Sequence, residues 1–159
     1  MALTIDLLRH GRALPDDPRG DLERRLTEAG ERTLERLGRR LAGEGWRPQR
    51  ALSSPYRRAL DSARILLRAS HAALDLEALD ALAPDNSPSE TLGALEALGI
   101  FEGHVLLVGH QPLLGRLAAA LTGAEHGFAP GGLLQIGCPQ GPEPGTCQVL
   151  RAIEPDVDC

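Results

Sequence analysis

Short apolar runs alternate along the chain with longer segments in which leucine and alanine recur every three or four residues. Residues 2–9 (ALTIDLLR), 50–53 (RALS) and 104–108 (HVLLV) have the length and composition of buried strands. The segments between them place apolar residues at helical spacing, as Leu34 and Leu37 do. The pattern therefore predicts strands that alternate with amphipathic helices.

A polar residue or a proline precedes each expected helix. Thr27 is a predicted N-cap, and Ser54-Pro55 predicts an N-cap followed by proline at the first helical position. Ser87 and Glu90 have the spacing of a capping box, and a fourth helix is expected after Gly109-His110-Gln111-Pro112. We expect the first of these helices to end near residue 43 and the third near residue 98, and the apolar stripes of the second and fourth to include Leu67 and Leu121.

The remaining apolar segments extend the sheet. A weak strand is predicted near residues 74–76, and two more, at 133–138 and 147–153, flank a loop rich in glycine and proline that is typical of a hairpin. No repeat or linker interrupts the pattern, so residues 1–159 are expected to form one domain. The alternation predicts a three-layer α/β/α fold with a mostly parallel central sheet.

Composition restricts the class of protein. With 42% hydrophobic and 25% charged residues, the chain resembles a globular protein rather than a disordered one. No apolar run approaches the roughly 18 residues of a membrane span, no secretion signal is recognisable, and the net charge of −5 argues against a general nucleic-acid surface. Because Cys138, Cys147 and Cys159 form no CxxC pair, we expect reduced thiols and a cytoplasmic protein.

Residues that suit catalysis end three of the expected strands. Arg9, His10 and Gly11 follow the first strand, His110 follows the strand at 104–108, and Arg58 lies in the first turn of the helix after 50–53. Ligands of parallel sheets bind beyond the carboxyl ends of the strands. We therefore expect these side chains to form one site.

Two arginines at a helix start are unusual, because the helix N-terminus already carries roughly half a positive charge. An anion held there by N–H groups and a guanidinium would remove the repulsion. We expect Arg58 to bind that anion, and Arg57 to be solvated or paired with Asp61. Arginines would repel a metal ion, which would also need carboxylate or thiolate ligands, so no metal is expected.

Histidines beside guanidiniums suit phosphoryl transfer. A neutral imidazole nitrogen attacks phosphorus, while positive groups hold the oxygens on which charge accumulates. No GxxxxGK[ST] loop is present, which argues against a nucleotide triphosphatase. We expect the other histidines, His71, His104 and His126, to be structural, with His104 at the opposite edge of the sheet.

Four motifs occur in one order along residues 3–120. LLRHGRA at 7–13 resembles the RHG signature of the histidine phosphatase superfamily, and RRLTEAG at 24–30 resembles the R-x-LTxxG that follows it. SSPYRRALDSA at 53–63 is similar to SPxxRAxQTA, and VLLVGHQPLL at 105–114 to VGHxPxL. The chain thus resembles the phosphoglycerate-mutase-like branch and, within it, the SixA-type phosphohistidine phosphatases.

The resemblance implies a phosphoglycerate-mutase-like fold, no cofactor and a set of residue roles. His10 becomes the phosphorylated nucleophile, and Arg9, Gly11, Arg58 and His110 become the phosphate pocket. SixA-type enzymes remove phosphate from a histidine on a partner phosphotransfer domain, so the implied partner is a phosphorylated protein.

Two positions depart from the family pattern. The QTA of the third motif reads Asp61-Ser62-Ala63, and we assign these residues no role. Family members that act on phosphate esters place a glutamate general acid in the region that reads ALAPDNSPSE here. Asp85 is the nearest carboxylate that could serve, while Glu90 is explained by its capping box; a loop aspartate before a turn is the alternative interpretation of Asp85.

We therefore expect a cofactor-independent phosphatase with His10 as nucleophile and phosphohistidine of a partner protein as substrate. A phosphatase of small phosphomonoesters, which would need a competent acid, is the alternative enzyme. A phosphate-binding module without turnover is the alternative outside the enzymes. Arg25 is predicted to be structural.

Overall fold

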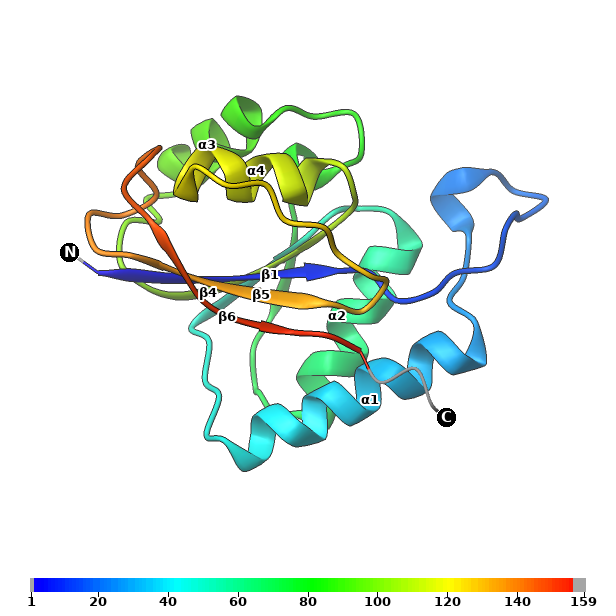
Figure 1. Cartoon of the computed structure of the whole chain (residues 1–159). Helices are drawn as coiled ribbons and strands as arrows, with labels where there is room; N and C mark the ends of the chain where they lie inside the picture. Colours follow the sequence, from blue (N-terminus) through cyan, green and yellow to red (C-terminus); the bar gives the residue numbers. More distant parts are fainter. Residues whose placement is uncertain (1, 156–159) are drawn as a thin grey trace.

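The computed structural model describes residues 2–155, and it contains a six-stranded sheet with helices on both faces (Figure 1). The strand order is β3-β2-β4-β1-β5-β6. The strands are β1 (Leu3–Arg9), β2 (Arg50–Ser53), β3 (Leu76–Ala78), β4 (Gly103–Gly109), β5 (Leu133–Cys138) and β6 (Gln148–Ile153). The helices are α1 (Glu28–Gly43), α2 (Arg57–Ala69), α3 (Pro88–Ala97) and α4 (Leu113–Thr122), with 3-10 turns η1 (Asp21–Glu23) and η2 (Asp80–Leu82).

The sheet is mostly parallel, as predicted. Strands β3, β2, β4 and β1 run parallel to one another, whereas β5 is antiparallel to both β1 and β6. Arg9 at the end of β1 lies opposite Gly109 at the end of β4. The two central strands therefore deliver the residues that follow them to the same edge of the sheet.

Two apolar cores hold the three layers together. Helices α3 and α4 cover one face of the sheet and α1 and α2 the other (Figure 1). Because side chains alternate along a strand, Leu3, Ile5 and Leu7 of β1 belong to the core under α3 and α4, while Leu8 belongs to the core under α1 and α2. The predicted α/β/α architecture is confirmed.

The predicted caps are correct for two helices and wrong for one. Thr27 Oγ1 accepts the N–H of Gly30, and Ser87 forms a capping box with Glu90. Ser54 is not an N-cap, since α2 begins at Arg57 after Tyr56. The hydroxyl of Ser54 is used elsewhere: it accepts the Tyr56 N–H at 3.2 Å and also contacts a histidine described below. Strand β3 lies two residues later than expected.

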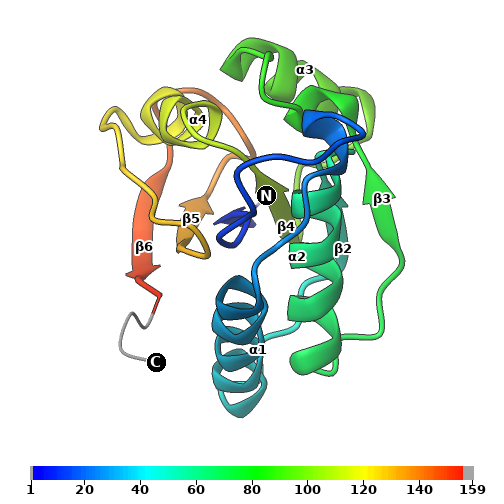
Figure 2. The ribbon, with the colours of Figure 1, turned by 90° about the vertical axis from the view of Figure 1, so that its right-hand side faces the viewer.

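Residues 12–26, here called the arm, leave the end of β1 and project beside the carboxyl edge of the sheet before entering α1 (Figures 1 and 2). Ala13 bridges to Leu26 at its base, and the Thr27 N–H donates to the Arg12 carbonyl at 2.9 Å. Gly30 is needed at this junction, because a Cβ there would lie 2.4 Å from the Arg12 carbonyl oxygen.

Two predictions concern the whole chain rather than the site. Cys138 and Cys147 are buried free thiols, and burial raises the pKa of Cys138; Cys159 lies outside the described residues. Within residues 2–155, none of the helices has the length and apolar character that crossing a membrane requires.

Candidate active site

His10 and His110 meet at the carboxyl edge of the sheet. Each follows one of the two central strands, and the backbone N–H of His10 donates to the Gly109 carbonyl at 3.1 Å. Their ring centroids are 5.0 Å apart with the planes at 60°. Both side chains are buried. The paired ends of β1 and β4 thus bring the two imidazoles into contact, as the sequence predicts.

The His10 ring is held as a neutral imidazole with a defined tautomer. Its Nδ1 lies 2.8 Å from the Gly11 carbonyl oxygen, which only accepts hydrogen bonds, so the proton must be on Nδ1. Nε2 then carries the lone pair and has no hydrogen-bond partner among residues 2–155. Burial, followed by the charges of Arg58, Arg9 and Arg24, lowers the pKa of His10 to about 4. At neutral pH this nitrogen is an available nucleophile.

The His110 ring is bonded on one side only. Nε2 lies 2.8 Å from Ser54 Oγ, and Nδ1 is buried without a hydrogen-bond partner in the described part of the chain. Ser54 Oγ also accepts the Tyr56 N–H and has one proton of its own to donate; in the tautomer in which Nε2 accepts that proton, the His110 proton is on Nδ1. Burial, then the proximity of His10 and Arg58, lowers the pKa of His110 to about 3. A buried donor without a partner indicates a place for a ligand acceptor.

Arg58 enters the site from the first turn of α2 and is buried. Its Nη1 donates to the backbone carbonyl of Asp21 in the arm at 2.9 Å, and its Nη2 lies 3.4 Å from the Asp21 carboxylate. Its guanidinium lies 5.0 Å from the centre of the Tyr56 ring, which in turn packs edge-on against His110 at 5.3 Å. Burial lowers the pKa of Arg58, which remains a cation.

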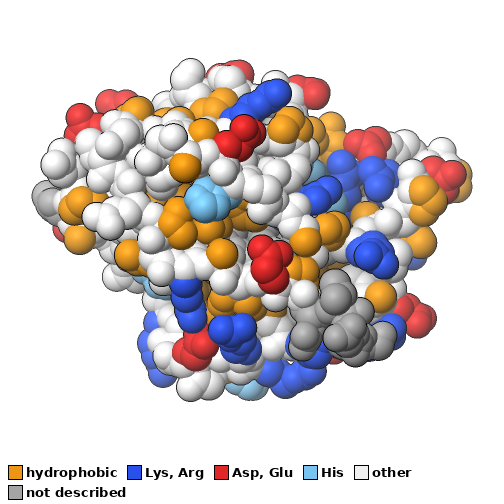
Figure 3. Space-filling model, viewed as in Figure 1, with side chains coloured by type: hydrophobic (Ala, Val, Ile, Leu, Met, Phe, Trp, Pro, Cys, Tyr) orange, Lys and Arg blue, Asp and Glu red, His pale blue; other side chains and the backbone are white. Residues whose placement is uncertain are grey.

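Arg9 supplies a second guanidinium from the end of β1. Its Nη1 donates to the Phe128 carbonyl at 2.7 Å, and its Nε is buried without a partner within residues 2–155. Arg24, on the arm, adds a third positive charge near His10. Figure 3 shows arginine side chains gathered where the arm meets the body of the molecule. The site is therefore a cluster of arginines around two neutral imidazoles.

Four residues of the site were not singled out from the sequence. Ser62 Oγ accepts the Gly11 N–H at 2.9 Å and donates to the Arg58 carbonyl at 2.6 Å, which ties the turn after His10 to the start of α2. Tyr56 packs edge-on against His110, and Ser54 contacts the Nε2 of the same ring. Asp21 pairs with Arg58. The motif position of Ser62 offered a signal, since the family pattern also has a hydroxyl there.

The other arginines near the site have different contacts. Arg57 pairs with Asp61 at 3.3 Å, as predicted, and also approaches Glu23. Arg25 is exposed, and its side chain forms no hydrogen bond or ion pair with residues 2–155. Its backbone carbonyl accepts the Leu14 N–H at 2.8 Å, which is the contribution it makes to the arm.

Asp85 is the carboxylate predicted as general acid. It lies in the turn between η2 and α3, and its carboxylate is exposed and makes no hydrogen bond or ion pair with the residues that the structure describes. Its role as a general acid stays a prediction. His104, by contrast, lies at the opposite edge of the sheet as expected, where its Nε2 contacts the buried Asp6.

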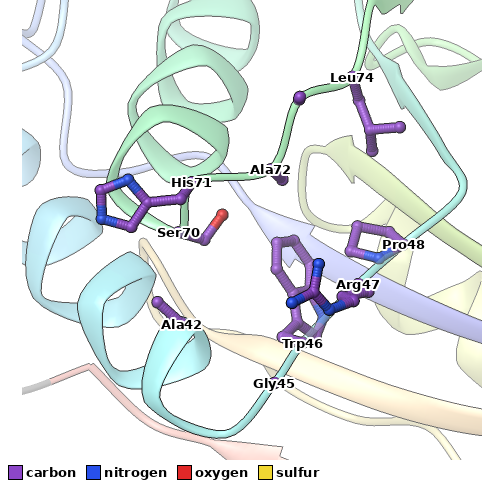
Figure 4. Close-up of a pocket in the computed structure, with 10 residues that line it drawn as sticks. Ala42, Gly45, Trp46, Arg47, Pro48, Ser70, His71, Ala72 and Leu74 are labelled. Atoms are coloured by element: carbon purple, nitrogen blue, oxygen red, sulfur yellow. The ribbon is translucent and has the colours of Figure 1, made fainter.

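A separate cavity of about 490 Å³ lies at that opposite edge, between the ends of α1 and α2 and the segment before β2 (Figure 4). Trp46, Arg47 and Pro48 lie on one side of it and Ser70 and His71 on the other. None of the residues of the site around His10 and His110 lines this cavity. Across residues 2–155, no group of three or more His, Cys, Asp or Glu side chains is placed to hold a metal ion.

Comparison with known proteins relates this geometry to a family. Residues 5–83 match the family model of the histidine phosphatase superfamily, branch 1. No curated protein matches the chain.

Among solved structures, the chain is similar to the protein histidine phosphatase SixA complexed with tungstate, at 25% identity and a TM-score of 0.83, over 95% of this chain and 96% of that one. A protein from Agrobacterium tumefaciens assigned as a phosphohistidine phosphatase SixA has 24% identity and a TM-score of 0.80, with 96% and 97% of the two chains covered. A mycobacterial glucosyl-3-phosphoglycerate phosphatase has 18% identity and a TM-score of 0.64, with 94% and 98% covered. The Agrobacterium protein and the mycobacterial phosphatase share the fold of this chain.

Proposed function

Because the chain belongs to the histidine phosphatase superfamily, we propose that it hydrolyses phosphohistidine on a partner protein through a phosphorylated His10. The observation that supports this best is the state of His10. Its Nδ1 proton is committed to the Gly11 carbonyl, its Nε2 is unpaired, and its pKa lies near 4. A buried imidazole in this state attacks phosphorus at neutral pH without first losing a proton.

In the first step the Nε2 lone pair of His10 forms a bond to phosphorus, and the P–N bond of the substrate breaks with its electron pair moving to the leaving imidazole. Arg9, Arg58 and the Nδ1–H of His110 donate to the phosphoryl oxygens, where negative charge accumulates. In the second step water attacks the phosphorylated His10, the P–N bond breaks, and inorganic phosphate is released. His10 recovers its lone pair.

The substrate class follows from the leaving group. A protonated phosphohistidine releases a neutral imidazole, whereas a phosphate ester releases an alkoxide that needs a proton, and a positioned acid typically contributes roughly 10²–10⁴-fold to such a step. Asp85 is exposed and forms no bond that would orient it. The likeness to a SixA protein histidine phosphatase supports the same substrate class.

Phosphate release from a phosphohistidine peptide and from an aryl phosphate, measured side by side with a chelator present, tests the proposal. We expect strong preference for the phosphohistidine peptide and loss of its turnover in His10→Ala. Arg58→Gln should lower kcat/KM by roughly 10²–10³-fold, because it removes a donor to the transferring group. Loss of activity with the chelator would contradict the expected independence from metals.

The alternative enzyme is a phosphatase of small phosphomonoesters. The similarity in fold to a glucosyl-3-phosphoglycerate phosphatase is compatible with this alternative. It requires Asp85 as general acid, so Asp85→Asn would then lower turnover of the aryl phosphate and leave the phosphohistidine peptide unaffected. A better rate on the ester in wild type would overturn the proposed substrate. Release from neither compound, with binding retained, would indicate the phosphate-binding module.

A further inference from the structure

A groove of about 370 Å³ lies between α2, the first turn of α1 and the base of the arm, and the reaction proposed above does not use it. We call it the arginine groove. It is lined by Arg25, Leu26, Glu31, Arg57, Asp61, Arg64, Ile65 and Arg68. Four of these eight residues are arginines, which is unusual for a chain of net charge −5.

One end of the groove lies at the first turn of α2, which also carries Arg58 of the site. Arg57 is the chain neighbour of the buried Arg58, and Arg57, Asp61, Arg64 and Arg68 follow at helical spacing along one face of α2. From Arg57 to Arg68 this face spans roughly 16 Å at the rise of an α-helix. That length matches about three turns of a helix lying along it.

The charges within the groove are only partly neutralised. Asp61 pairs with both Arg57 and Arg64, at 3.3 and 3.2 Å. Arg25 and Arg68 are exposed, and neither side chain has an ion-pair or hydrogen-bond partner in residues 2–155. Leu26 and Ile65 are buried at its floor. The groove thus presents two guanidiniums that have no ion-pair partner within residues 2–155.

We propose that the arginine groove binds an acidic helical segment of the partner protein. This segment either carries the phosphohistidine or lies next to the segment that does, and the inference rests on the proposed function. Carboxylates at helical spacing on the partner would pair with Arg25 and Arg68 while its phosphorylated imidazole enters between Arg9 and Arg58. A nucleic acid fits less well, because Glu31 and Asp61 would repel a continuous row of phosphates.

The test uses two synthetic helical peptides that carry one phosphohistidine each. One has glutamates along a face beside the phosphohistidine, and the other has glutamines at the same positions. For the wild type we expect kcat/KM to be roughly 2- to 30-fold higher on the acidic peptide, since each of the two exposed ion pairs contributes about 0.2–1 kcal/mol. This ratio should shrink as salt is added, because exposed charges are screened.

In the double variant Arg25→Gln/Arg68→Gln the ratio between the two peptides should fall to about one. The matched control is Arg39→Gln/Arg47→Gln, which removes two other exposed arginines that have no hydrogen-bond or ion-pair partner within residues 2–155 and do not line the groove. It has the same net charge and should keep the wild-type ratio. An equal fall of the ratio in both double variants would mean that only net charge matters, and an unchanged ratio in Arg25→Gln/Arg68→Gln would also overturn the inference.

A binding measurement separates this inference from the proposed reaction. The unphosphorylated forms of both peptides are titrated against two proteins, the His10→Ala variant and the same variant that also carries Arg25→Gln/Arg68→Gln, and the dissociation constants are compared. If the wild type hydrolyses neither phosphopeptide, the proposed function fails, yet tighter binding of the acidic peptide that depends on Arg25 and Arg68 still supports the groove. Hydrolysis of both peptides with equal binding of the two leaves the function standing and refutes the groove. Equal competition by a short RNA would also refute it.

Discussion

Acidification should destabilise the folded protein through the two site histidines. His10 and His110 are buried, and their pKa values lie near 4 and 3 in the folded state. In the unfolded chain both should titrate near 6.5. Between these values the unfolded chain binds more protons than the folded protein, so the free energy of unfolding must fall as the pH is lowered.

The size of the effect follows from the two pKa differences. At pH 5.5 a free imidazole is about 90% protonated, whereas one with a pKa of 4 is about 3% protonated. Between pH 7.5 and pH 5 each of the two histidines should therefore reduce the free energy of unfolding by about 2 kcal/mol. The contribution is fully present above about pH 7 and declines steadily below that.

Urea unfolding at pH 7.5 and pH 5 measures this in wild type, His10→Gln and His110→Gln, with His126→Gln as the control for a histidine outside the site. Each site variant should lose about 2 kcal/mol less stability on acidification than the wild type. Imidazole C–H resonances followed by NMR report the same titrations directly. Equal losses in all four proteins, or a His10 resonance that titrates near 6.5, would refute the reasoning that burial keeps these rings neutral.

Two further predictions concern the packing around the site. Ser62→Ala leaves the Gly11 N–H buried without its acceptor, so the free energy of unfolding should fall by about 1–3 kcal/mol in urea titrations; no change would mean that another acceptor replaces Ser62. Gly30→Ala places a Cβ 2.4 Å from the Arg12 carbonyl oxygen and should destabilise by roughly 1–3 kcal/mol. Gly93→Ala, also in a helix but in open space, should instead stabilise by about 0.5–1 kcal/mol, and similar melting temperatures for the two variants would contradict this contrast.

The residues that carry the proposed chemistry were recognisable from local sequence. His10 and His110 each end an apolar run, which marks the carboxyl edge of a parallel sheet, and Arg58 stands at a helix start where a cation needs an anion beside it. Thr27 and the Ser87–Glu90 capping box were correct because capping involves residues three positions apart. The prediction of Ser54 as an N-cap was wrong because its contact is with a residue far along the chain. Its hydroxyl faces His110, 56 residues further along the chain.

Local patterns of the sequence thus determined the alternation of strands and helices, the motif residues and most helix boundaries, because these depend on hydrophobic periodicity and on contacts within one turn. Tertiary structure alone decided the contacts that complete the site. Asp21 reaches Arg58 across 37 residues, and Ser62 reaches Gly11 across 51. Such pairings depend on strand order and on the path of the arm, which no local spacing encodes. The arginine groove also depends on the tertiary structure, since it forms where α2 lies beside the arm and the first turn of α1.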